Sequence, residues 1–94
     1  KEFEMKVNLK DYGLCDVVKN EYPNGNLALS LKDEYGSPIA NISTNIIPLF
    51  DNQFALDVNN LSLIVDEVIA SGFFKDTGDV VQSGFVEYPI YELV

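Results

Sequence analysis

The chain of 94 residues contains no arginine, no histidine and no tryptophan, and it has a single cysteine. Without histidine, the Ser-His-Asp and Cys-His catalytic arrangements are excluded, together with the commonest side-chain ligand of transition metals. Without arginine, the chain lacks the usual bidentate ligand of phosphate and the usual reader of guanine edges. These absences argue against histidine-dependent catalysis and against direct binding of nucleic acid.

The single cysteine, Cys15, cannot form an internal disulfide, whereas small secreted domains usually carry paired cysteines. Its apolar and acidic neighbours predict a raised thiol pKa, so we expect a buried, unreactive side chain. The charged start of the chain, residues 1–4, does not resemble a signal peptide. The single unpaired cysteine favours a cytoplasmic location. No apolar run reaches about 18 residues, so we expect no membrane span.

The chain is strongly acidic, with fifteen Asp and Glu against six Lys and a net charge of −9. After Lys32 the only base is Lys75, against ten acidic residues. This excess predicts a local acidic patch that binds a basic protein partner. Its candidate residues are Asp66, Glu67, Asp76 and Asp79. The alternative is that the carboxylates only keep the chain in solution.

The best-specified stretch is a hairpin at residues 26–45. Leu27, Leu29 and Leu31 alternate with smaller or polar residues, which is typical of a half-buried strand. Asp at the first and Gly at the last position of Asp33–Gly36 indicate a type I turn. A second alternating run follows over residues 39–46. The predicted register pairs Lys32 with Ser37, Leu29 with Ala40, and Leu27 with Ile42, which places the apolar side chains on one face.

Four further strands are expected. They are an alternating strand at Phe3–Leu9, a less regular one at Cys15–Tyr22, a short one at Phe54–Val58, and a last one at Phe85–Val94. Pro89 conflicts with the two apolar sets of the last strand, because proline favours an edge or a bulge. Residues 75–84 are polar and are expected to form a loop or a loose hairpin.

One helix is predicted after Asn59 or Asn60, either of which is a good N-cap. Its apolar stripe has helical spacing and comprises Leu61, Ile64, Val65, Val68 and Ile69. The sequence therefore predicts the α+β class, with a single domain over residues 1–94. We expect an antiparallel sheet of five or six strands with one amphipathic helix packed on one face.

Two short motifs point to chemistry only weakly. Asp76-Thr77-Gly78 matches the aspartic protease triplet, but only sixteen residues follow it and turns favour the same residues. Asp57-Val58-Asn59-Asn60 departs from a calcium loop after its third position, which favours a helix cap. The six glycines are scattered and form no phosphate loop, so no cofactor and no metal are expected.

Several turn and strand residues resemble those of a small uncharacterised bacterial family found on plasmids, integrative elements and phages of Gram-positive bacteria. The resemblance covers about residues 24–94, and the stretch after the helix is less typical. It is carried by Asn26, Leu27, Ala28, Gly36, Asp57, Asn59, Asn60, Ser83, Gly84, Phe85, Tyr88, Pro89 and Tyr91. The resemblance implies an accessory protein of a mobile element that binds and blocks host machinery, including defence nucleases. It implies no catalytic residues.

Three hypotheses follow for the function. The first is a non-enzymatic interaction protein that inhibits a host nucleic-acid-binding or defence protein through its acidic face. The second is a structural or regulatory module that forms a homodimer through strand edges, with tyrosines as anchors. The candidate anchors are Tyr12, Tyr22, Tyr35 and Tyr91. The third and most remote is a small hydrolase with paired carboxylates.

Overall fold

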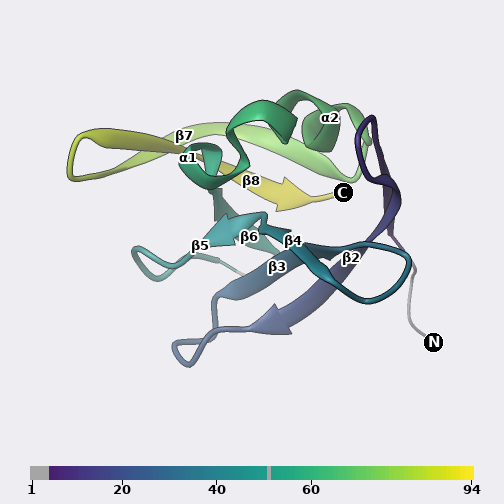
Figure 1. The fold of residues 1–94 in the computed structure, drawn as a ribbon. Coiled ribbons are helices and arrows are strands. Elements are labelled where there is room, and N and C mark those ends of the chain that lie inside the picture. The colour runs from purple at the N-terminus through teal and green to yellow at the C-terminus, as the bar shows by residue number, and fades with distance from the viewer. Residues whose placement is uncertain (1–4, 51) are drawn as a thin grey trace.

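The computed structural model describes residues 5–50 and 52–94, which form two antiparallel sheets with a helical segment beside them (Figure 1). The first sheet has the order β1-β2-β3-β4, with β1 at Lys6–Leu9, β2 at Gly13–Glu21, β3 at Leu27–Lys32 and β4 at Pro38–Asn41. The second has the order β5-β6-β8-β7, with β5 at Ser43–Thr44, β6 at Gln53–Leu56, β7 at Phe74–Ser83 and β8 at Val86–Leu93. The predicted α+β class is confirmed.

The number of strands differs from the prediction at two places. The run expected as one strand over residues 39–46 is divided into β4 and β5, which belong to different sheets. The polar stretch expected as a loop or a loose hairpin is the long strand β7, which forms a hairpin with β8. Of the first predicted strand, Val7 and Leu9 are buried and Phe3 lies outside the described residues.

Ile42 joins the two sheets at the point where β4 ends and β5 begins. Its N–H donates to the carbonyl of Leu29 in β3 at 2.9 Å, and its own carbonyl accepts from the N–H of Asp57 at 2.8 Å. The hydroxyl of Ser43 accepts from the N–H of Leu29 at 2.9 Å. The chain thus passes from one sheet to the other at a single buried residue, as in other folds where a strand changes sheet.

The predicted register of the central hairpin is wrong by two residues. Lys32 faces Pro38 and Leu31 faces Ala40. Gly36, with a φ of +83°, follows a type I turn and adds one residue to the loop, and a bulge between Leu31 and Lys32 adds the second. Because side chains alternate with a period of two, this shift still buries the predicted face.

The helical segment has three parts: α1 at Val58–Leu61, a 3-10 turn η1 at Ser62–Ile64, and α2 at Val65–Ala70. The predicted caps are wrong, because the Asp57 side chain accepts from the N–H of Asn60 at 3.1 Å and the helix begins two or three residues earlier than expected. Ser62 interrupts the segment with a φ of +44°. The apolar stripe nevertheless packs on the core, with Leu61 and Val68 buried.

The core lies between the two sheets and the helical segment. Phe54 is at its centre, with a T-shaped contact to Phe74 at 5.5 Å and a tilted contact to Tyr91 at 6.4 Å between ring centroids. The remaining members of this buried cluster are Val7, Leu9, Cys15, Leu27, Leu29, Leu31, Ile42, Leu56, Leu61 and Val68. Ala55 and Ile90 are also buried and directly paired, but they lie outside this cluster, on the other face of the second sheet.

An irregularity in β7 between Asp76 and Val80 explains the Asp-Thr-Gly triplet of the sequence. Asp76 accepts from the N–H of Gly78 at 2.9 Å, and the Thr77 hydroxyl donates to the carbonyl of Ile90 at 2.7 Å. The Asp-Thr-Gly triplet therefore stabilises a local break in the strand. Pro89 lies opposite Val80, and the pairing of β8 with β6 ends at Ile90, so β8 tolerates a residue without an N–H at this position.

Candidate binding groove

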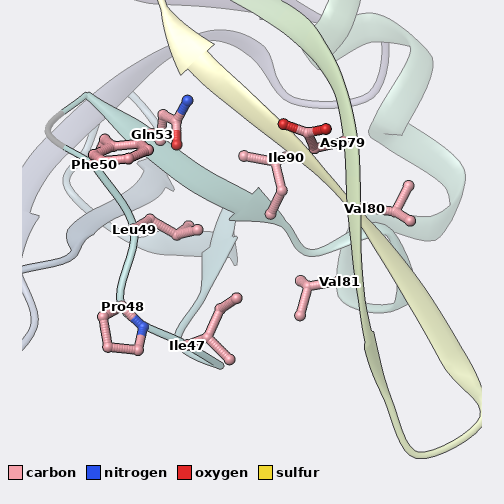
Figure 2. Close-up of a pocket in the computed structure, with 9 residues that line it drawn as sticks. All are labelled: Ile47, Pro48, Leu49, Phe50, Gln53, Asp79, Val80, Val81 and Ile90. Carbon is pink, nitrogen blue, oxygen red and sulfur yellow. The ribbon is translucent and has the colours of Figure 1, made fainter.

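A surface groove with a volume of about 430 Å³ lies on the outer face of the second sheet (Figure 2). One wall is the loop before β6, the other is β7, and Ile90 of β8 lies between them (Figure 2). Its lining residues are Ile47, Pro48, Leu49, Phe50, Gln53, Asp79, Val80, Val81 and Ile90.

The loop wall is held in place by the buried side chain of Asn26, which is only 6% exposed. Its amide nitrogen donates to the side-chain oxygen of Asn45 at 2.8 Å and to the carbonyl of Ile47 at 2.6 Å. Its side-chain oxygen accepts from the N–H of Leu49 at 3.0 Å. One buried amide group therefore bonds three positions in the first part of the loop and fixes this part of the wall against the turn before β3.

The strand wall presents alternate residues of β7 to the groove. Figure 2 shows Asp79 and Val81 directed toward the groove, whereas Val80 points to the other side of the strand. The opening is strongly apolar, since Phe50 is 82% exposed and Ile47 is also exposed. An exposed apolar surface of this kind marks sites where proteins bind ligands or other proteins.

Asp79 places one carboxylate in this apolar setting. Within the part of the chain that the structure describes, Asp79 accepts no hydrogen bond and forms no ion pair. The only ion pair between described residues joins Lys6 and Asp16, on the first sheet. The Asp79 carboxylate is therefore available to a cation from outside the chain.

The four predicted acidic residues fall on two separate elements. Asp66 and Glu67 begin α2, which packs beside β1 of the first sheet, whereas Asp76 and Asp79 lie on β7, the outermost strand of the second sheet. Glu67 accepts from the N–H of Lys10 at 2.6 Å, so it stabilises the turn after β1. Asp76 accepts within the irregular part of β7. Of the four, Asp79 is the one that lines the groove.

The apolar part of the groove was not anticipated from the sequence. Its loop wall is the run Ile47-Pro48-Leu49-Phe50, whose apolar character is unusual for a loop and is the one local signal of a binding surface. The role of Asn26 depends on contacts with residues about twenty positions later. No local pattern around Asn26 reveals those contacts.

Among the residues that the structure describes, two groups have a clearly raised pKa, and both lie in the core. Burial raises the pKa of the Cys15 thiol, with smaller contributions from the carboxylates of Asp33, Asp16 and Glu34. The predicted burial of Cys15 is confirmed. Burial, followed by the charge of Asp76, raises the pKa of Tyr91. Tyr91 is a core residue, so its predicted role as a surface anchor is wrong.

The other predicted tyrosine anchors have different positions. Tyr12 and Tyr35 are exposed on turns, whereas the Tyr22 hydroxyl donates to the carbonyl of Ser43 at 3.1 Å. Over residues 5–50 and 52–94, no group of three or more Cys, Asp or Glu is placed to hold a metal ion.

No helix in the described ranges is long and apolar enough to cross a membrane. The groove, with its apolar walls and its single carboxylate, is the site from which a function can be argued. No family model, curated protein or solved structure matches the chain.

Proposed function

We propose that the chain is a non-enzymatic binding domain of a mobile genetic element, which docks on a basic host protein through the groove. The observation that carries this proposal is the Asp79 carboxylate, which lines an otherwise mostly apolar groove without a partner in the described fold. A protein segment with an apolar side chain next to a lysine or arginine has the matching chemistry.

The charge of the whole chain supports a basic partner. A net charge of −9 attracts positively charged surfaces over about a Debye length and accelerates their association. Nucleic-acid-binding proteins present such surfaces, because they neutralise phosphates with lysine and arginine. A defence or regulatory protein of this class is therefore the partner that we propose, with inhibition as the result of occupying its basic surface.

A homodimer is the second candidate, favoured by the exposed outer edge of β7 and by the exposed rings of Tyr12 and Tyr35. Two chains that each carry a net charge of −9 repel one another, most strongly at low salt. A dimer of this kind becomes tighter as salt is added, whereas binding to a basic partner becomes weaker. Sedimentation velocity at two salt concentrations distinguishes the two candidates.

The groove is tested by charge reversal in a pull-down from nuclease-treated host lysate. We expect Asp79→Lys to lose the proteins that the wild type retains and releases with salt. Glu34→Lys is the matched control, because Glu34 is exposed on the β3–β4 turn, away from the groove. The variant Asp66→Lys tests whether α2 contributes to binding of the partner. Equal recovery of the same proteins by wild type and Asp79→Lys would overturn the proposal.

A further inference from the structure

The outer edge of β7 is the longest of the four terminal sheet edges, since the terminal strands β4 and β5 have only four and two residues. β1, the other terminal strand of the first sheet, has only four residues, α2 packs beside it, and Glu67 occupies the N–H of Lys10 that follows it. β7 has ten residues, and its second half forms a hairpin arm that extends beyond the rest of the fold (Figure 1). Sheet edges of this length are usually blunted or paired.

The register identifies which main-chain groups of this arm point outward. Ser83 pairs with Val86 across the two-residue turn of Gly84 and Phe85. The two residues of such a closing pair exchange two main-chain hydrogen bonds. From there along the hairpin, hydrogen-bonded pairs alternate with pairs that exchange no hydrogen bond. Val81 bonds to Tyr88 of β8, whereas the main-chain groups of Val80 and Gln82 point away from β8. Val80 is 59% exposed and Gln82 is exposed, so this edge is open to solvent.

We propose that β7 binds an extended segment of the basic partner as an added strand, hydrogen-bonded to the main chain of Val80 and Gln82. This inference rests on the proposed function and specifies how the partner is held. Addition of a strand to a free edge is a recurrent mode of peptide recognition, in which main-chain hydrogen bonds supply affinity and side chains supply specificity.

Charge complementarity selects a basic segment as the occupant. Asp79 lies at one end of this edge, with its side chain on the groove face, whereas Val80 points to the opposite face (Figure 2). In a strand added beside Val80 and Gln82, alternate side chains lie on the same face as Asp79, so lysines at these positions are favoured. The exposed Val80 side chain offers an apolar contact for the residues between them. A second copy of the chain brings the same negative charges together and is disfavoured.

The test uses a blocked octapeptide of alternating lysine and valine as the probe, with the wild-type protein observed by NMR. We expect the amides of Val80 and Gln82 to shift and to become protected from hydrogen exchange on addition of the peptide. The amides of Val81 and Ser83 are the internal controls, because they are already bonded to β8. Binding is expected to weaken with salt.

Gln82→Pro removes the outward N–H without removing a bond to β8, and an extended Val81 is compatible with a following proline. We expect this variant to bind the peptide at least tenfold more weakly, with Gln82→Ala within about twofold of the wild type. The melting temperature of each variant checks the fold. If Gln82→Pro does not fold, protection of the Val80 and Gln82 amides from hydrogen exchange in the wild type still tests the added strand.

Four outcomes overturn the added strand. The first is equal binding by Gln82→Pro and Gln82→Ala. The second is a set of peptide-induced shifts confined to groove residues such as Ile47 and Ile90, which would leave the proposed function standing. The third is no binding of the peptide; the lysate experiment with Asp79→Lys then decides the proposed function independently. Self-association that is abolished by Gln82→Pro also overturns it, with a second copy as the occupant.

Discussion

The side-chain amide of Asn26 donates to the main-chain carbonyl of Ile47 at 2.6 Å, and so connects the turn before β3 to the wall of the groove. The same side chain accepts from the N–H of Leu49 at 3.0 Å. A polar side chain that is buried and bonded at both ends is costly to remove, because its former partners lose their hydrogen bonds.

We therefore expect Asn26→Ala to lower the free energy of unfolding by about 2–3 kcal/mol. The matched control is Asn41→Ala at an exposed position of β4, where the expected change is within about 0.5 kcal/mol. Urea denaturation measures both. In the folded variant, the amides of Ile47 and Leu49 should exchange faster, and equal stability of the two variants would contradict the role of Asn26.

Ser62 has a φ of +44° and a ψ of −96°, a conformation that side chains other than glycine rarely adopt. We expect Ser62→Gly to raise the free energy of unfolding by about 0.5–1 kcal/mol, since glycine adopts a positive φ without a steric cost. Asn59→Gly, inside α1, should lower it by up to about 1 kcal/mol. Thermal denaturation of both variants gives the signs, and a loss of stability in Ser62→Gly would contradict the prediction.

Stability should fall at alkaline pH. Burial raises the pKa of the Cys15 thiol above its ordinary value of 9.0, so the folded state retains a proton that the unfolded chain loses. The contribution is fully present below pH 9.0 and is lost as the pH rises through the folded-state pKa. Tyr91 adds the same effect from its ordinary value of 10.0.

Denaturation midpoints between pH 8 and pH 11 should reveal this loss. The variant Cys15→Ala removes the thiol and should show a smaller decrease near pH 9.0 than the wild type does. Its absolute stability is lower, because the buried sulfur leaves a small cavity. Parallel pH profiles for the two proteins would contradict the contribution of Cys15.

Two phenylalanines should respond in opposite ways to truncation. Phe54 is 1% exposed at the centre of the core, and Phe54→Ala should cost about 3–5 kcal/mol. Phe85 at the tip of the β7–β8 hairpin is 106% exposed, so Phe85→Ala should change stability by less than about 0.5 kcal/mol. Guanidinium denaturation distinguishes them, and a large loss in Phe85→Ala would mean that the tip packs on the fold.

The adjacent acidic residues Asp66 and Glu67 of α2 should also differ in their effect on stability. Glu67 accepts from the N–H of Lys10, so Glu67→Ala should lower the free energy of unfolding by about 1–2 kcal/mol. Asp66 is exposed and accepts no hydrogen bond within the described ranges, so Asp66→Ala should have little effect. Glu67→Gln, which keeps an acceptor oxygen, should recover part of the loss in the same denaturation assay.

Local periodicity predicted the elements whose burial follows a simple pattern. The alternating leucines of β3 and the apolar stripe from Leu61 to Ile69 both pack as expected, because burial acts directly on that spacing. β7 escaped prediction because most of its second half is exposed on both faces and carries no alternation. The hairpin register was missed because two one-residue irregularities add no visible pattern.

The groove could not be predicted from the sequence for a different reason. The excess of acidic residues in the second part of the chain predicts that Asp79 belongs to an acidic patch. Asp66 and Glu67 of the same predicted patch lie beside the other sheet. The pairing of the loop wall with β7 depends on long-range contacts through Asn26. Composition indicates charge, whereas placing that charge beside an apolar wall requires the tertiary structure.

The position of Ile42 between the two sheets affects how the protein unfolds. Its peptide groups are bonded to Leu29 on one side and to Asp57 on the other, so neither sheet has a free boundary where they meet. Loosening one sheet therefore removes support from the other, and the two are coupled as a single cooperative unit. A cut of the chain beside Ile42 would remove the shared element from both halves, and neither half would be a self-sufficient fragment.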